Sequence, residues 1–239
     1  MIEKKQWQQE IIKRYPKNPI ITLDDIPQVA NSVFNAAAAR YQDKYLLLLR
    51  VEGSEGKSRF FLAESANGIK FKIFQEPVMQ RSEEEPFKRY EKRGVEDPRI
   101  TKIEDTYYIL YTAYSHNGAR IALASTDDFK TFRRIALISE PENKNAVLFP
   151  KKVNDHFIRF DRPAREGIWI SYSRDLIYWG NSRCVMESRP GYWDSDRIGA
   201  GAPPIETERG WLEIYYGAYD TCICLGTSNL NNLVERCFD

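Results

Sequence analysis

The stretch Gly94-Val95-Glu96-Asp97-Pro98-Arg99 places a carboxylate and a guanidinium around a residue that restricts the backbone. Pro98 fixes its own φ and disfavours the helical region for Asp97, so we predict an extended segment. Extended side chains alternate between faces, which would put Asp97 and Arg99 together in one pocket and Glu96 on the other face. The simpler alternative is a surface turn in which Asp97 and Arg99 form an exposed ion pair of little energetic value.

The elements that must position this segment are short strands. From Asn31 onward, runs rich in β-branched and aromatic residues are separated by turn residues. These runs cover residues 45–51, 59–64, 107–114, 121–125, 157–160, 168–172 and 211–216. No helical pattern interrupts them, which predicts an all-β sandwich, barrel or propeller.

A sequence repeat favours the propeller among these folds. Each copy ends a strand with a Ser and places an Asp or Asn two residues later, where it can cap its own turn. The serines are Ser65, Ser125, Ser173 and, in a fainter copy, Ser228. Their spacing of roughly 50–60 residues fits one four-stranded blade per copy. In a propeller the inner strands converge on a funnel, and side chains at strand ends carry the chemistry.

A short amphipathic helix is predicted before the strands, because apolar residues recur at helical spacing from Trp7 until Pro16 ends the pattern. We therefore divide the chain into a helix over residues 1–18 and a β-propeller domain over 19–239. The helix could pack on that domain or against another subunit of a homo-oligomer, and both arrangements fit the pattern.

The composition narrows the class of protein. Lys and Arg number 35 against 34 Asp and Glu, which argues against nucleic acid or an anionic membrane as a partner. The charged start lacks a signal sequence and no later run could span a membrane, so a cytoplasmic location is expected. Four cysteines without CxxC spacing and 2 histidines predict no metal site and no cofactor. Aromatic residues make 13% of the chain, which suits β-structure and the stacking of sugar rings.

Short motifs in a fixed order add a more specific signal. They are Asn31-Ser-Val-Phe-Asn35, Leu48-Leu-Arg50-Val-Glu52, Gly94-Val-Glu-Asp-Pro-Arg99, Tyr111-Thr-Ala-Tyr114, Asn145-Ala-Val-Leu-Phe-Pro150, Arg162-Pro163, Trp193-Asp194, Gly199-Ala-Gly-Ala-Pro-Pro204 and Gly210-Trp-Leu. From about Asn31 to about Leu233 this series resembles glycoside hydrolase family 130, which comprises β-mannoside phosphorylases and some β-mannosidases. The resemblance implies a five-bladed β-propeller whose funnel binds β-linked mannosides and inverts the anomeric configuration.

The resemblance also implies roles for individual residues. Asp97 falls at the position of the general acid, which in the family acts through a hydroxyl of the bound mannose. The residues implied or proposed for the sugar site are Asn35, Arg50, Arg99, Tyr114, Trp193 and Asp194. A basic set resembles the phosphate-binding groups and consists of Arg120, Lys144, Lys151 and Arg162, with Tyr216 beside it. Inorganic phosphate is the implied co-substrate.

At two positions this chain departs from the family's residues, and both affect whether phosphate or water is the nucleophile. Inverting hydrolysis needs a second carboxylate to activate water, whereas phosphorolysis needs a cationic clamp for phosphate. In the family's phosphorylases, histidines are common where this chain has Tyr216 and Asp161. A carboxylate at Asp161 would either hold Arg162 in place or activate water and shift the reaction toward hydrolysis.

A third departure is length, since family members continue for many tens of residues beyond the equivalent of Leu233. We therefore expect a truncated last blade, and a natural truncation, a fragment and closure by the N-terminal segment all fit. The favoured function is an inverting β-mannoside phosphorylase that releases α-mannose 1-phosphate. The alternatives are an inverting β-mannosidase and a carbohydrate-binding propeller with impaired catalysis.

Overall fold

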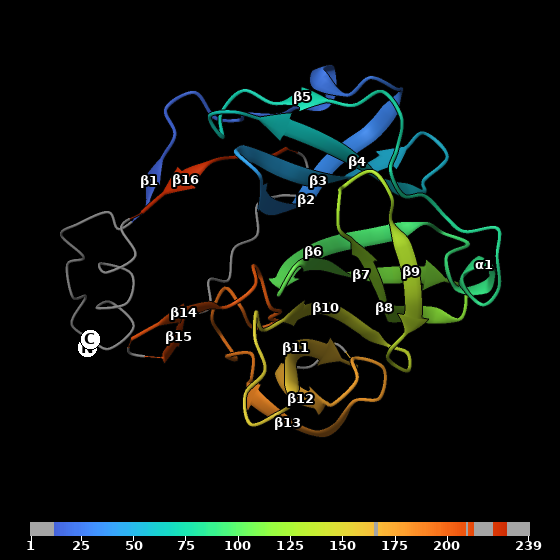
Figure 1. Cartoon of the computed structure of the whole chain (residues 1–239), viewed down its shortest axis with the longest axis vertical. Coiled ribbons are helices and arrows are strands. Elements are labelled where there is room, and N and C mark those ends of the chain that lie inside the picture. The colour runs from blue at the N-terminus through green and yellow to red at the C-terminus, as the bar shows by residue number, and fades with distance from the viewer. Residues whose placement is uncertain (1–11, 165–166, 209, 213–221, 229–239) are drawn as a thin grey trace.

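Three four-stranded antiparallel sheets follow one another along the chain in the computed structural model (Figure 1). The structure describes residues 12–164, 167–208, 210–212 and 222–228. Sheet 1 contains β2 (Ala30–Tyr41), β3 (Lys44–Gly53), β4 (Ser58–Ser65) and β5 (Lys72–Ile73). Sheet 2 contains β6 (Val95–Ile103), β7 (Thr106–Ser115), β8 (Gly118–Thr126) and β9 (Arg133–Leu137). Sheet 3 contains β10 (Asn143–Leu148), β11 (Phe157–Pro163), β12 (Ile168–Ser173) and β13 (Gly180–Met186). The predicted all-β class is confirmed.

Short elements complete the described part of the chain. Strand β1 (Lys13–Arg14) pairs with β16 (Gly226–Thr227), and β14 (Ile205–Thr207) pairs with β15 (Gly210–Leu212). The helical turns are η1 (Leu23–Asp25) and α1 (Phe87–Tyr90). Residues 1–11 of the predicted N-terminal helix lie outside the described residues, and the next residues form strand β1 instead of a helix. None of the described helices is long and apolar enough to cross a membrane.

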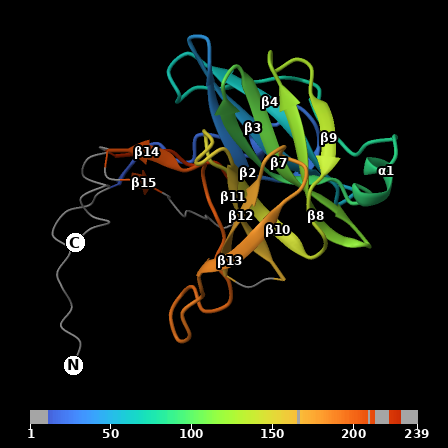
Figure 2. The same cartoon turned by 60° about the horizontal axis from the view of Figure 1, so that its bottom comes forward.

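Each sheet is a meander in which consecutive strands are hydrogen-bonded neighbours. Figure 1 shows the sheets arranged along an arc, with β14–β15 and β1–β16 beside its open side, and in Figure 2 β14–β15 again lie to one side of the four-stranded sheets. The first strands of the sheets lie side by side, because β6 contacts both β2 and β10. Side chains on these first strands can therefore meet although they are far apart in sequence.

Apolar clusters hold the sheets together. One cluster joins the facing surfaces of sheets 1 and 2 through residues such as Phe60 and Ile109. Another joins sheets 2 and 3 through residues such as Leu123 and Leu148. Sheet 2 is therefore covered on both faces, which explains why β8 is almost continuously buried instead of alternating. The burial of these side chains is the main source of stability for this arrangement.

The repeated turn is present at the end of the third strand in each sheet. Ser65 and Asn67 accept backbone N–H bonds of one turn, and Ser173 and Asp175 do so in another. In sheet 2 the pair is Thr126 and Asp128, one residue later than predicted. The polar capping pair was therefore predicted correctly in kind, but its register in the second copy was wrong.

Candidate active site

The first strand of each four-stranded sheet carries a β-bulge at an equivalent position. The pairing register shifts after Phe34 in β2, after Glu96 in β6 and after Lys144 in β10. The next residues, with φ values of 46°, 50° and 55°, are Asn35, Asp97 and Asn145. Asn and Asp adopt this left-handed conformation more readily than most other residues with a side chain. Because a bulge re-aims side chains, each strand can present a polar group at the same level of the structure.

Asp97 lies at the centre of these strands and is only 8% exposed. Its Oδ1 accepts a hydrogen bond of 2.8 Å from Asn35 Nδ2 and an ion-paired bond of 2.7 Å from Arg50 Nη1. No described residue is bonded to its Oδ2 in a hydrogen bond or ion pair. One oxygen of the carboxylate is thus fixed by the protein, while the other is available to a ligand.

Glu96 shares this centre, contrary to the prediction that it points to the opposite face. Arg50 bridges both carboxylates, because its Nη2 lies 2.9 Å from Glu96 Oε1 while its Nη1 bonds Asp97. The other Glu96 oxygen accepts a 2.9 Å bond from Lys144 Nζ of β10. The physical reason is the bulge: Asp97 is left-handed instead of extended, so the alternation of faces is interrupted. The alternative of an exposed Asp97–Arg99 pair is also wrong.

Burial opposes ionisation of Asp97, but the surrounding cations outweigh it and lower the pKa of this carboxyl below its usual value. The largest favourable contributions come from Arg50 and Arg99, followed by the Asn35 hydrogen bond and Lys144. Asp97 is therefore a carboxylate at neutral pH in the ligand-free protein. An added anion would raise its pKa by cancelling part of the positive potential.

Glycine and carbonyl groups fix the position of this segment. A Cβ atom at Gly94, where φ is 105°, would lie 2.4 Å from the Ser58 carbonyl oxygen, so only glycine allows β6 to approach β4 this closely. Ser58 Oγ in turn accepts a 2.9 Å bond from Arg50 Nε. On the other side, Arg99 Nε donates to the Gly201 carbonyl at 2.5 Å. The segment that contains Gly201, one of the motifs quoted from the sequence, is therefore tied directly to β6.

Lys144 and Arg162 are direct cross-strand partners between β10 and β11, so they share a face of sheet 3. Next to them, Gly199 approaches Asn145 so closely that an added Cβ would lie 3.1 Å from Asn145 Cγ and 3.5 Å from Arg162 Nη1. Lys144 also reaches Glu96, as described above. Two members of the predicted basic set thus come together beside the Asp97 centre.

The other members of the predicted phosphate set have different surroundings. Arg120 lies over the Tyr90 ring with its Nη1 3.6 Å from Glu140. Lys151 forms an ion pair with Glu206, and both side chains are about half exposed. No described contact brings Arg120 or Lys151 to Lys144. Tyr216 lies outside the described residues.

The predicted sugar contacts also divide into two groups. The Tyr114 ring lies 5.1 Å from Lys144 Nζ and 5.4 Å from the Arg93 guanidinium, which places it beside the candidate centre. Trp193 is 87% exposed, and Asp194 is bonded through both carboxylate oxygens to Arg189 Nε. Asn35, Arg50 and Arg99 were discussed above and do surround Asp97.

Asp161 is paired with Arg159 on its own strand. Its carboxylate is 1% exposed and accepts bonds from Arg159 Nε at 2.9 Å and from Asn143 Nδ2 at 3.3 Å. Asn143 in turn accepts a 3.2 Å bond from the Arg162 backbone N–H through its Oδ1. Burial raises the pKa of Asp161 and lowers that of Arg159, against their mutual attraction. The Arg159–Asp161 pair is thus buried within sheet 3.

Replacing Asp161 with Ala should destabilise the protein by about 3–5 kcal/mol, because it leaves the Arg159 charge buried without its partner. The free energy of unfolding from urea titration at neutral pH measures this loss. The double substitution Arg159→Met with Asp161→Leu removes both charges and should cost much less. A double variant as unstable as the single one would contradict the assignment of the loss to an unpaired charge.

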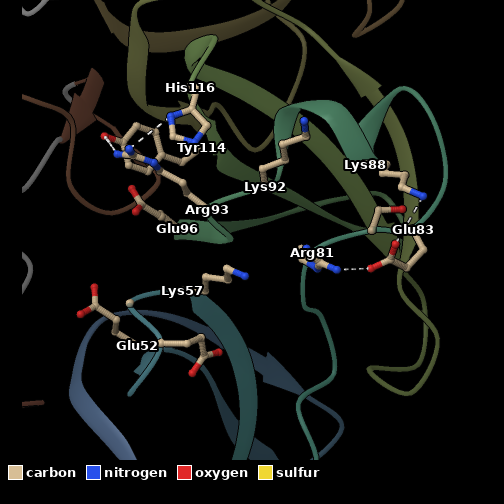
Figure 3. A pocket seen from close by; sticks show the side chains of 13 residues that line it. Glu52, Lys57, Arg81, Glu83, Lys88, Lys92, Arg93, Glu96, Tyr114 and His116 are labelled. Carbon is tan, nitrogen blue, oxygen red and sulfur yellow. Dashed lines mark hydrogen bonds and ion pairs between the residues drawn. The ribbon is translucent and has the colours of Figure 1, made fainter.

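A cavity of about 590 Å³ opens beside this centre, between sheets 1 and 2 (Figure 3). Glu96 and Tyr114 line its inner side, and Lys57 projects from the opposite wall. We call it the Lys57 cavity. Its basic lining residues are Lys57, Arg81, Lys88, Lys92, Arg93 and His116. Within the residues described, no group of three or more His, Cys, Asp or Glu side chains could hold a metal ion.

Several residues of the centre were missed by sequence reasoning, namely Glu96, Ser58, Phe34, Asn145 and the Gly201 carbonyl. Phe34 stacks on Arg50 with the guanidinium carbon 4.3 Å from the ring centroid. A usable signal was present for the bulges, since Asn35, Asp97 and Asn145 are each followed by Ala or Pro. No local signal indicated that Glu96 would join them.

Comparison with known proteins identifies a matching family model and several relatives of the chain. A family model for glycoside hydrolase 130, described as beta-1,4-mannooligosaccharide phosphorylase, matches residues 2–224. The chain is 35% identical over 224 residues to a beta-1,4-mannooligosaccharide phosphorylase of Ruminococcus albus, covering 89% of this chain and 66% of that protein. It is 31% identical to a beta-1,2-mannobiose phosphorylase of Listeria innocua, covering 87% of this chain and 75% of the relative. The chain thus spans two thirds to three quarters of the length of these relatives.

Solved structures agree with the sequence comparisons. The beta-1,2-mannobiose phosphorylase of Listeria innocua, solved with beta-1,2-mannobiose, superposes with a TM-score of 0.79 at 30% identity. That match covers 91% of this chain and 78% of the other. A glycosyl hydrolase of Bacteroides ovatus gives the same TM-score at 22% identity and shows the shared fold.

Proposed function

The chain belongs to glycoside hydrolase family 130, and from this premise we propose that it cleaves β-mannosides by phosphorolysis with inversion, releasing α-mannose 1-phosphate. In this proposal Asp97 is the general acid, and Asn35, Arg50 and Arg99 surround the mannose unit. Lys144 and Arg162 form the core of the phosphate clamp. We also propose that the sheets are blades of a five-bladed β-propeller with the site in its funnel.

The observation that carries the proposal is a buried carboxylate held among cations, whose Oδ2 is bonded to no residue in the described part of the chain. Asn35 and Arg50 orient Asp97 through Oδ1, which leaves Oδ2 to exchange a proton with a hydroxyl or glycosidic oxygen of the sugar. The cross-strand pair of Lys144 and Arg162 lies on the adjacent strands. Several cations at a recessed site can bind a phosphate dianion and orient one of its oxygens toward the anomeric carbon.

Phosphate binding would also allow Asp97 to become protonated. The lowered pKa of Asp97 means that the ligand-free protein holds a carboxylate, which cannot act as an acid. A phosphate dianion beside Lys144 adds negative charge close to Asp97 and so raises its pKa. Asp97 would therefore be protonated, and able to act as the acid, only when phosphate is bound as the nucleophile.

Hydrolysis is the second candidate, because Glu96 lies beside Asp97 and supplies a second carboxylate to the centre. An inverting hydrolase uses such a carboxylate to activate water. The ion pairs of Glu96 with Arg50 and Lys144 occupy both of its oxygens, which leaves neither one open to a water molecule. For this reason we favour phosphorolysis.

The test is to incubate the protein with β-1,2- and β-1,4-mannobiose, each with and without inorganic phosphate. We expect cleavage only with phosphate, and one mannose 1-phosphate formed for each disaccharide consumed, as measured by phosphorus NMR, which also reports the anomeric configuration. Equal release of mannose without phosphate would instead establish the hydrolase. Sugar binding without cleavage under either condition would establish a carbohydrate-binding protein with impaired catalysis.

A further inference from the structure

The lining of the Lys57 cavity carries Lys57, Arg81, Lys88, Lys92 and Arg93 against the carboxylates of Glu52, Glu55, Glu83 and Glu96, an excess of one positive charge. Glu83 is paired with Arg81 at 2.7 Å and with Lys88 at 3.6 Å. Glu55 is paired with Arg59, outside the basic lining set. In the described part of the chain, Lys57 and Lys92 form no ion pair with any carboxylate. Two ammonium groups therefore border an open space of about 590 Å³ without an ion pair to any described carboxylate.

Arg93 and His116 extend this basic surface toward Tyr114. Arg93 Nη2 donates to His116 Nδ1 at 3.3 Å, and Arg93 Nη1 donates to the Tyr114 hydroxyl at 3.4 Å. Because His116 accepts this bond at Nδ1, its neutral ring carries a proton on Nε2 and can donate it. Figure 3 shows these three side chains across the space from Lys57. The cavity thus combines unpaired ammonium groups with further hydrogen-bond donors.

The loop that precedes β6 carries most of these cations, and a buried hydrogen-bond network around Glu91 holds it in place. Glu91 is fully buried and accepts bonds from the Tyr111 hydroxyl at 2.7 Å and from Arg134 Nε at 2.9 Å. Its second oxygen accepts a 2.7 Å bond from the Ser82 backbone N–H. This buried network joins both ends of the loop that precedes β6. The basic side chains are therefore presented by a fixed backbone instead of a loose surface loop, which lowers the entropic cost of binding.

From this geometry we propose that the Lys57 cavity binds a phosphate dianion, either inorganic phosphate or the phosphate group of a phosphorylated sugar. Lys57 and Lys92 provide the charge, and Arg93 and His116 provide further donors, a combination that matches the several acceptor oxygens of phosphate. The site is separate from the proposed Lys144–Arg162 clamp but adjoins it through Glu96, which lines the cavity and bonds Lys144. It stands independently of the proposed reaction.

The experiment measures binding by calorimetry in the Lys144→Met variant, so that the adjacent clamp is weakened. Inorganic phosphate, glucose 6-phosphate and uncharged glucose are titrated separately. We expect both anions to bind, and Lys57→Ala or Lys92→Ala to weaken each about tenfold, the loss of one charge-assisted contact. Lys57→Arg should retain binding because it keeps the charge.

Lys130→Ala is the matched control, since Lys130 is exposed and lies outside the cavity lining. If glucose 6-phosphate binds more than about tenfold more tightly than inorganic phosphate, the ligand is a phosphorylated sugar, because the sugar then contributes contacts of its own. Equal affinities assign the site to the phosphate group alone. The proposal is overturned if Lys57→Ala and Lys92→Ala bind both anions as Lys130→Ala does, if neither anion binds, or if glucose binds as tightly.

Discussion

Asp97→Asn should lower kcat for phosphorolysis of a β-mannoside by about 10²–10⁴-fold, because the amide cannot donate the proton that a general acid supplies. The amide oxygen can still accept the bonds from Asn35 and Arg50, so the centre should keep its shape. Initial rates of mannose 1-phosphate formation at saturating phosphate measure the effect. A variant that keeps its affinity for the disaccharide but loses turnover would separate a chemical role from a binding role.

Asp43→Asn is the control, because Asp43 is an exposed turn carboxylate with the same chemistry and no contact with the centre. It should retain the parent rate. The pH profile provides a second readout: an acid must be protonated, so activity should fall as the pH rises above the pKa of Asp97 in the phosphate complex, and this basic limb should be absent from the residual rate of Asp97→Asn. Full activity in Asp97→Asn would exclude this residue as the proton donor.

Arg50→Met should lower the free energy of unfolding by about 3–5 kcal/mol, because it leaves two buried carboxylates without their shared cation. Arg50 is 8% exposed and bonds Asp97, Glu96 and Ser58. The free energy of unfolding from urea titration at neutral pH measures the loss. Because folding lowers the pKa of Asp97, this stabilisation is present above the unfolded-state pKa and is lost as the pH falls through the folded-state pKa.

Arg133→Met is the matched control for that experiment. Arg133 also forms an ion pair with an aspartate, Asp127, but the Arg133 side chain is 58% exposed and the Asp127 side chain is 50% exposed. Removing such a surface pair should cost only about 0–1 kcal/mol. Equal losses in the two variants would show that Arg50 contributes no more than a surface ion pair, and that Glu96 and Asp97 tolerate its absence.

Strand prediction succeeded at the second and third strands, which are mostly buried, and failed at the first strands and at the short or largely exposed fourth strands β5, β9 and β13. The predicted runs 45–51, 59–64 and 107–114 correspond to β3, β4 and β7, which are second and third strands. The first strands β2, β6 and β10 were not predicted. They carry polar residues directed to the centre and a bulge that breaks the period of two. A pattern search for regular alternation cannot recognise a strand whose function requires that it be interrupted.

The amino-acid sequence alone determined the all-β class, the repeated capping turns and the family, because these depend on local preferences and on motifs that occur in order along the chain. It also identified Asp97, Asn35, Arg50 and Lys144 as candidates through the family resemblance. Only the tertiary structure decided which of them meet. The partners of Asp97 come from β2 and β3, and those of Glu96 come from β3 and β10, so their contacts depend on how separate sheets pack. The left-handed bulge at Asp97 decided that Glu96 lies inside the centre, because one residue of irregular backbone reverses the face that alternation assigns.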